Sequence, residues 1–240
     1  MIKNTIKKLL KRIPINFTKN QRYDSETIRV INTICTKDSN CVDVGAHKGE
    51  VLDKILSNAP QGNHFAFEPI PFLYENLKKK YNGRKNVQIS NVALSNKSGE
   101  TSFNYVVSNP SYSGLIKRKY DRKNESDETI TVTTDLLDNI APAEYKADFI
   151  KIDVEGGEFL VLTGAKELIK RSKPVIIFEH GLGASDYYGT KPEDVYRLLD
   201  DCGLKISLMK RWLNKKAPLT IEQFKKIFDE NSDYYFIAYP

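Results

Sequence analysis

Two apolar segments that lie far apart in the chain each end in glycines and acids. Residues 42–49 read VDVGAHKG, and residues 151–158 read KIDVEGGE. In an open parallel sheet, ligands bind outside the carboxyl ends of the strands, often on a glycine-rich turn. We therefore expect these two segments to bring a glycine loop and an acidic cluster to the same edge of one sheet.

The chain from residue 41 onward alternates short apolar runs with amphipathic segments. This is the pattern of a parallel sheet that is covered by helices on both faces. It predicts an α/β fold with seven strands. The predicted strands cover 41–45, 63–68, 86–92, 148–154, 174–179, 204–209 and 234–239, and the predicted helices cover 25–36, 49–57, 71–81, 157–171, 191–202 and 220–229.

The length of 240 residues fits one α/β domain with additions. We interpret residues 1–22 as a basic N-terminal arm and 23–240 as a single domain. Residues 95–133, between the third and fourth strands, are rich in Gly, Ser, Asn and charged residues. We predict an insertion there, consisting of a small hairpin followed by a loop that can act as a lid.

The positive charge of the chain is concentrated in the arm. The formal net charge is +6, and residues 1–22 hold seven lysines and arginines and no acid, which leaves the rest of the chain at −1. A nucleic-acid-binding domain carries its basic residues on the face that binds. The charge distribution therefore does not favour a nucleic acid as the partner of this domain.

The apolar residues of 2–13 follow helical spacing, with lysines on the other side. Such a helix can lie on an anionic membrane surface, or it can be a solvated extension or pack against a partner. No segment approaches the ~20 apolar residues of a membrane span. Three scattered cysteines indicate neither a disulfide framework nor a zinc site. The expected location is the cytoplasm, with peripheral contact to the inner face of the membrane as one role for the arm.

The first glycine loop has the spacing Gly45-x-x-x-Gly49, which lacks the middle glycine that brings backbone close to a pyrophosphate. A dinucleotide-dependent oxidoreductase is therefore disfavoured. Glu68 ends the next predicted strand, where an acid can accept hydrogen bonds from the two hydroxyls of a ribose. A strand, a glycine loop, a helix, a strand and a terminal acid in this order indicate a nucleoside-containing cofactor.

The sequence resembles the FkbM-type methyltransferases between Asp43 and His180. The resemblance is carried by VDVGAHKGE, FAFEP (65–69), NVALS (91–95), SGL (113–115), KIDVEGGE and PVIIFEH (174–180). It implies S-adenosylmethionine as cofactor and the Rossmann-like class I methyltransferase fold. That fold has a mostly parallel seven-stranded sheet with helices on both faces and an antiparallel last strand.

The resemblance also implies roles for single residues. The loop after the first strand matches the motif around the methionine part of the cofactor, although the family often has Asn at the position of His47. Glu68 matches the acid that binds the ribose, and the third strand end matches the segment beside the adenine. The implied cofactor-binding residues are Asp43, Gly45, Ala46, His47, Gly49, Glu68, Asn91 and Ala93.

Methyl transfer to an oxygen requires a group that takes the proton of the acceptor. Asp153 is the first candidate for this base, Glu179 and His180 at the next strand end are second, and His47 is third. In the alternative interpretation, Asp153 binds the cofactor amine and Glu155 caps the following helix. Tyr112, Ser113 and Glu155 are candidates for binding the acceptor.

The predicted function is O-methylation of a sugar or glycan-precursor hydroxyl, in surface polysaccharide or specialised-metabolite biosynthesis. A nucleotide-linked or lipid-linked sugar is one form of the acceptor, since a basic run at 117–123 can meet a diphosphate. The alternatives are methylation of RNA or of another small molecule, and a non-catalytic cofactor-binding or membrane-recruited module. Several acids near one crevice can also hold Mg²⁺, but their spacing does not favour a metal site.

Overall fold

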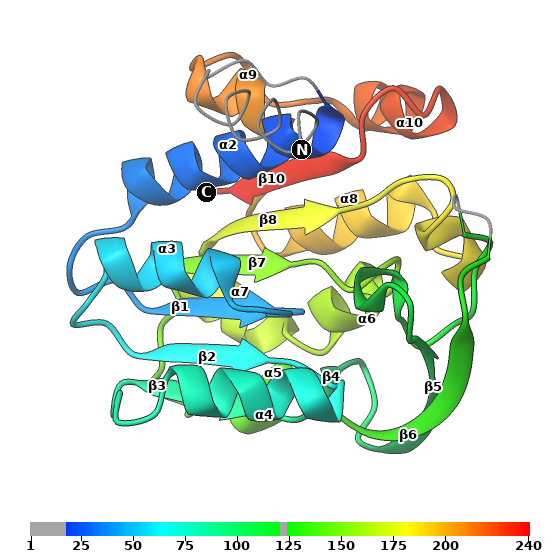
Figure 1. Ribbon diagram of the computed structural model, residues 1–240. Helices are drawn as coiled ribbons and strands as arrows, with labels where there is room; N and C mark the ends of the chain where they lie inside the picture. The colour runs from blue at the N-terminus through cyan, green and yellow to red at the C-terminus, as the bar shows by residue number, and fades with distance from the viewer. Residues whose placement is uncertain (1–17, 121–123) are drawn as a thin grey trace, which may run out of the picture.

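The computed structural model describes residues 18–120 and 124–240, so the helix predicted over 2–13 lies outside the described residues. The strands of the main sheet are β1 (Cys41–Val44), β2 (His64–Phe67), β3 (Val87–Ser90), β7 (Phe149–Ile152), β8 (Val175–Glu179), β9 (Lys205–Leu208) and β10 (Tyr235–Tyr239). Their order is β3-β2-β1-β7-β8-β10-β9 (Figure 1). The first five strands in this order run parallel, and β10 pairs antiparallel with β8 and β9. The predicted mostly parallel sheet with an antiparallel last strand is confirmed.

Helices cover both faces of this sheet (Figure 1). Successive side chains of a strand point to opposite faces, so Val42 and Val44 pack in one core and Cys41 in the other. The helices on the face of Cys41 are α2 (Lys19–Ile34), α3 (Glu50–Asn58), α4 (Pro71–Lys80) and α9 (Met209–Leu213). Those on the other face are α5 (Leu137–Ile140), α6 (Glu158–Thr163), α7 (Lys166–Ser172), α8 (Pro192–Asp201) and α10 (Ile221–Asp229).

Two helices differ from the prediction. The helix expected over 25–36 begins at Lys19, because Thr18 caps it: the Thr18 hydroxyl accepts a hydrogen bond from the N–H of Gln21 at 3.2 Å. The helix expected over 157–171 divides into α6 and α7 at Gly164, where a Cβ would lie 2.0 Å from the carbonyl oxygen of Ser95. Within the described residues, no helix is both long and apolar enough to cross a membrane.

The insertion forms a second, three-stranded sheet beside the carboxyl ends of the main strands (Figure 1). The strands are β4 (Ala93–Leu94), β5 (Gly99–Val106) and β6 (Asp127–Asp135), in the order β4-β6-β5. β5 and β6 form the predicted hairpin, but the long loop connects these two strands instead of following them. This loop contains the short 3₁₀ helix η1 (Pro110–Tyr112), and a second one, η2 (Ser185–Tyr188), follows β8.

α2 is anchored to the segment before β10. Asp233 accepts hydrogen bonds from the guanidinium of Arg22 at 2.8 Å and from the hydroxyl of Tyr23 at 2.5 Å. The ring of Tyr23 also stacks on Tyr235 at a centroid distance of 5.0 Å. One carboxylate therefore holds two side chains of the helix against the last strand.

Replacing Asp233 with alanine removes the shared acceptor of Arg22 and Tyr23. We expect the free energy of unfolding, measured by urea denaturation, to fall by about 1–3 kcal/mol, since hydrogen bonds to charged groups contribute in this range. The control is Asp229→Ala, because Asp229 is exposed and pairs with Lys225 one helical turn away. Asp229→Ala is expected to lower the free energy of unfolding by less than about 0.5 kcal/mol. Equal losses in both variants would contradict the anchoring role of Asp233.

Candidate active site

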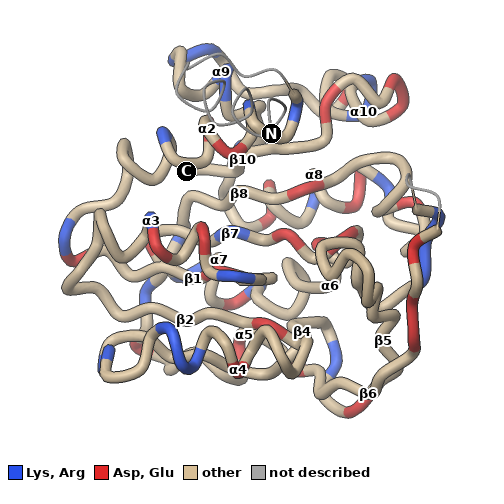
Figure 2. Tube along the Cα trace, in the orientation of Figure 1, with Lys and Arg blue, Asp and Glu red and all other residues tan. Residues whose placement is uncertain are grey.

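A cavity of about 1050 Å³ opens at the carboxyl edge of the main sheet. It is bounded by the loops that follow β1, β2, β7 and β8, by α2, and by the insertion. Acidic residues gather where β7 and β8 end (Figure 2). The predicted site residues that line the cavity are Gly45, Ala46, His47, Glu68, Ala93, Tyr112, Ser113, Asp153, Glu155 and Glu179. Those outside the lining are Asp43, Gly49, Asn91 and His180.

The loop after β1 requires glycine at its first position. Gly45 has a φ of +75°, and a Cβ there would lie 2.0 Å from the carbonyl oxygen of Asp153. The N–H groups of Gly45 and Ala46 both donate to the carbonyl of Phe67 at 3.0 Å, which ties the loop to β2. Glycine at position 45 therefore lets the loop pack closely against Asp153, and the loop lines the cavity at Gly45 and Ala46.

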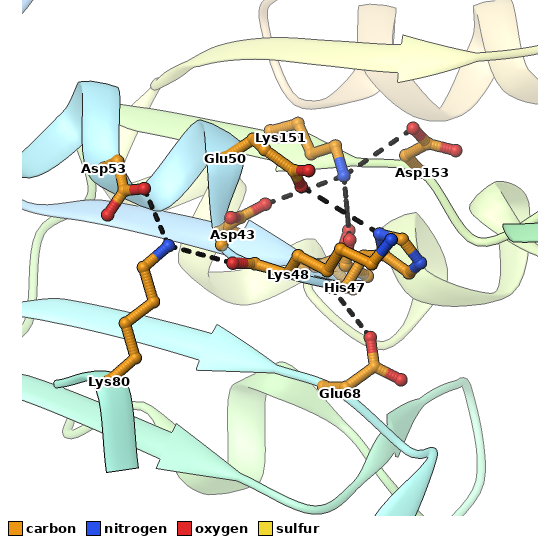
Figure 3. Close-up of polar contacts among 12 residues, drawn as sticks. Asp43, His47, Lys48, Glu50, Asp53, Glu68, Lys80, Lys151 and Asp153 are labelled. Carbon is orange, nitrogen blue, oxygen red and sulfur yellow. Dashed lines mark hydrogen bonds and ion pairs between the residues drawn. The ribbon is translucent and has the colours of Figure 1, made fainter. Parts of the chain in front are cut away.

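Glu68 is buried at the end of β2 and is held by two backbone donors. Its Oε2 accepts from the N–H of His47 at 2.8 Å (Figure 3), and its Oε1 accepts from the N–H of Ile70 at 3.0 Å. Burial raises the pKa of Glu68, and the two hydrogen bonds oppose this shift by stabilising the charged form. A carboxylate oxygen can accept more than one hydrogen bond, so Glu68 can still bind a ligand hydroxyl.

Two predicted cofactor residues support the loops from outside the cavity. The amide of Asn91 donates to the carbonyls of Glu68 and Pro69, both at 2.9 Å, and thereby holds the turn after β2. Gly49 has a φ of +77° directly before α3, and its carbonyl accepts from the hydroxyl of Tyr81 at 2.9 Å. Both residues position the backbone that lines the cavity.

Lys151 connects the two segments that the sequence singled out. Its Nζ lies 3.6 Å from Oδ1 of Asp43 and 3.6 Å from Oδ2 of Asp153, and it donates to the carbonyl of Gly45 at 2.9 Å (Figure 3). Burial lowers the pKa of Lys151, but the charges of Asp153 and Asp43 outweigh burial and raise the pKa above its ordinary value. The ammonium is therefore retained inside the protein.

Sequence reasoning missed Lys151, although a signal for it exists. The residue stands in the middle of a predicted strand, between the apolar residues Ile150 and Ile152. A lysine is almost never fully buried unless it is paired. A basic residue in a central strand therefore indicates a carboxylate on a neighbouring strand, and Asp43 lies opposite Lys151 in the register of β1 and β7.

Asp153 and Glu179 are carboxylates in different environments. The Asp153 side chain is 31% exposed, and its Oδ2 accepts from the hydroxyl of Tyr235 at 2.8 Å. Burial raises the pKa of Glu179 well above its ordinary value, and the charges of Asp153 and Glu158 act in the same direction. Neighbouring titratable groups with different environments can divide acid and base roles between them.

His180 points away from the cavity. Its ring is buried and stacks on Phe224 at 5.7 Å and on Phe228 at 4.8 Å, both in α10. Burial lowers its pKa to about 4, so the imidazole is neutral. Of the two residues predicted at this strand end, the structure therefore brings Glu179 and not His180 to Asp153.

The predicted acceptor-binding residues lie on the side of the insertion. Glu155 has a φ of +59° and forms an ion pair with Arg118. Arg118 also donates to the carbonyl of Gly183 at 3.3 Å, and its guanidinium lies 5.3 Å from the centre of the Tyr112 ring. Ser113 accepts a hydrogen bond from a backbone N–H of β5. The insertion is thus fastened to the loop after β7.

Glu158 holds the loop after β7 through its backbone. Its buried carboxylate accepts from the N–H groups of Val154 at 3.0 Å and Gly156 at 3.1 Å. Burial raises its pKa to about 7. Across the described ranges, 18–120 and 124–240, no group of three or more His, Cys, Asp or Glu side chains is arranged to hold a metal ion.

Replacing Lys151 with methionine removes the charge that faces Asp43. Asp43 then becomes a buried carboxylate without its counter-ion, so we expect the free energy of unfolding near neutral pH to fall by about 3–5 kcal/mol in urea denaturation. The double variant Lys151→Met/Asp43→Asn is the control, because it also removes the unpaired charge and should recover roughly half of the loss. A stable single variant would contradict this pairing.

Glu158 makes stability depend on pH. Because its pKa is about 7 in the fold against an ordinary 4.5, the folded protein binds more protons than the unfolded chain between these values. The group therefore lowers the free energy of unfolding as pH rises through this window. Glu158→Gln keeps an acceptor oxygen and removes the titration. Between about pH 4.5 and pH 8, the free energy of unfolding of the variant should rise relative to that of wild type by up to about 3 kcal/mol, measured by urea denaturation. If the difference in free energy of unfolding between the two proteins did not change with pH, the raised pKa of Glu158 would be contradicted.

Comparison with known proteins identifies relatives. The family model "Methyltransferase FkbM domain" matches residues 43–206. Hexuronic acid methyltransferase AglP of Haloferax volcanii is 27% identical over 203 residues, which cover 83% of this chain and 77% of that protein. Methyltransferase FkbM from Methylobacillus flagellatus KT superposes with a TM-score of 0.54 at 17% identity. That match covers 85% of this chain and 44% of the solved chain, so this chain spans less than half of that structure.

The structural likeness shows the Rossmann-like methyltransferase fold. The site also fits the cofactor of such enzymes: Gly45 and Ala46 of the glycine loop line the cavity, and Glu68 offers acceptor oxygens at the end of β2. The family match spans more than half of the chain and includes both segments that meet at Lys151. The chain therefore belongs to the FkbM methyltransferase family and is an S-adenosylmethionine-dependent methyltransferase.

Proposed function

We propose that the protein methylates a hydroxyl of a sugar or glycan precursor, in surface polysaccharide or specialised-metabolite biosynthesis. The observation that carries this proposal is the similarity, over 83% of the chain, to a protein named as a hexuronic acid methyltransferase. Hexuronic acids are sugar acids. The hydroxyls and aromatic rings on the insertion side of the cavity, such as Ser113 and Tyr112, suit a polyhydroxylated acceptor.

The cofactor would be held by the loop of Gly45, Ala46 and His47, by Glu68, and by Ala93. The Glu68 carboxylate is rigid because two backbone N–H groups orient it, and it can accept hydrogen bonds from ribose hydroxyls. In this proposal Asp43, Gly49 and Asn91 act indirectly by holding those loops. When bound, the cofactor supplies an activated methyl group, so the protein has to position the acceptor and take its proton.

Asp153 is the proposed base. It lines the cavity, it is partly exposed, and Lys151 balances its charge. Glu179 is the second candidate, but its raised pKa means that it has to lose a proton before it can accept one. His47 is the third, since burial lowers its pKa and keeps the imidazole neutral. Because these groups can take the proton directly, Mg²⁺ has no part in the proposal.

The carrier of the sugar is a finer part of the proposal. In the basic run, Lys117 pairs with Asp127 and Arg118 pairs with Glu155, whereas Lys119 lines the cavity. Lys119 can therefore meet the diphosphate of a nucleotide-linked or lipid-linked sugar. The arm of residues 2–13 precedes α2, which forms a wall of the cavity. Peripheral binding of this arm to the inner face of the membrane would bring the cavity close to a lipid-linked acceptor.

Transfer of labelled methyl tests the proposed acceptor. Full-length protein and labelled S-adenosylmethionine are added to an extract of source cells that lack this gene, and the extract is fractionated. We expect alkali-stable label in the nucleotide-sugar or lipid-linked fraction, because a methyl ether resists hydrolysis. Label in RNA or protein would contradict the acceptor class. Alkali-labile label in a sugar fraction would place the methyl group on a carboxylate instead of a hydroxyl.

Replacing Asp153 with asparagine removes the proposed base while keeping the size of the side chain. We expect turnover in the same assay to fall by ~10²-fold or more. Cofactor affinity, measured by calorimetry, should change only a few-fold, because Glu68 and the loop of Gly45 remain. The control is Asp200→Asn, an exposed residue of α8 outside the cavity lining. Near-normal turnover would transfer the role to Glu179, which Glu179→Gln then tests.

A further inference from the structure

Tyr235 lies at the start of β10, and no sequence pattern singled it out. It lines the cavity, and it pairs with Glu179 in the antiparallel register of β10 and β8. Directly opposed residues of an antiparallel pair project to the same face of the sheet. The Tyr235 hydroxyl donates to Oδ2 of Asp153 at 2.8 Å. β10 thus places a donor on the side chain proposed as the base.

A hydroxyl donor and an ammonium face the same oxygen of Asp153. Tyr235 donates to Oδ2, and the ammonium of Lys151 lies 3.6 Å from that atom. Neither group donates a hydrogen bond to Oδ1. The side chain is therefore fixed through one oxygen, while the other is not used by either of them.

Tyr235 is itself held in place. Its ring stacks on Tyr23 of α2 at 5.0 Å with an interplanar angle of 21°, and Tyr23 is fastened by Asp233. Burial raises the pKa of Tyr235 well above its ordinary value, and the charges of Asp153 and Glu179 act in the same direction. The phenol therefore keeps its proton and remains a donor.

We propose that Tyr235 is a positioning residue that, with Lys151, holds Oδ2 of Asp153 and directs Oδ1 to the acceptor hydroxyl. This inference rests on the proposed role of Asp153. The hydroxyl gives its proton to Oδ1 as its oxygen forms a bond to the methyl carbon, and the electrons of the broken carbon–sulfur bond stay on sulfur. Orientation of a base by a third group is the arrangement found in catalytic triads.

Tyr235→Phe tests this role, because it keeps the ring that stacks on Tyr23 and removes the hydroxyl. A hydrogen bond to an ionised group favours the charged form. The titration of the Asp153 carboxyl carbon, followed by ¹³C NMR in Asp-labelled protein and assigned with Asp153→Asn, should move to higher pH by about one unit. This readout needs no acceptor, so it is independent of whether the proposed sugar substrate is right.

Other charged groups also face Asp153, and the Tyr235→Phe variant retains all of them. They are Lys151, Asp43, Asp24 of α2, His47, Glu158 and Glu179. A matched control is Tyr239→Phe in the same strand, whose ring packs against Trp212 at 6.2 Å outside the cavity lining. It should leave the Asp153 titration unchanged.

Turnover gives the second readout. With any acceptor that the labelled-methyl assay reveals, Tyr235→Phe should lower kcat about tenfold, move the acid limb of the pH profile to higher pH, and leave the KM for S-adenosylmethionine unchanged. In the Asp153→Asn background the same change should have no further effect. An unmoved Asp153 titration, or an equal loss in that background, would overturn the positioning role. Normal turnover of Asp153→Asn alone would instead overturn the choice of base.

Discussion

The geometry of the site depends on the contacts of the buried Lys151 ammonium. Taking a charge out of water costs several kcal/mol unless partners compensate it. Here the compensation comes from Asp43 on the neighbouring strand, from Asp153 at the end of the same strand, and from the carbonyl of Gly45. One side chain thus joins β1, β7 and the glycine loop. The carboxylate of Asp153 is placed at the cavity by the same contact that holds the loop.

The acids around this ammonium do not share one environment. Asp153 lies beside Lys151 and Tyr235, whereas burial raises the pKa of Glu179 and of Glu158. One carboxylate, Asp153, is thereby partly exposed at the cavity, and another, Glu158, holds the loop that follows it. At Glu179 and Glu158, burial and the charges of neighbouring carboxylates both raise the pKa. The different environments of the three acids therefore follow from where the fold places them.

Segments outside the parallel sheet complete the cavity. α2 forms one wall and is tied to the strand that carries Tyr235, through Asp233 and the stack of Tyr23 on Tyr235. The insertion forms another wall and is fastened to the loop after β7 by Arg118 and Glu155. Both walls are therefore connected to the loop after β7: the insertion by an ion pair, and α2 through Tyr235, whose hydroxyl donates to Asp153.

The sequence alone determined the parallel sheet, the glycine loop and the acids at the strand ends, because periodicity, glycines and strand-end acids are local signals, whereas the antiparallel last strand was implied only by the resemblance to the family. Tertiary structure decided which of these residues meet. It turned His180 onto Phe224 and Phe228, placed Asn91 behind the turn it supports, and brought Lys151 to Asp43 and Tyr235 to Asp153. Strand order and register set the pairings of Lys151 with Asp43 and of Tyr235 with Asp153, and these pairings join residues that no local pattern relates.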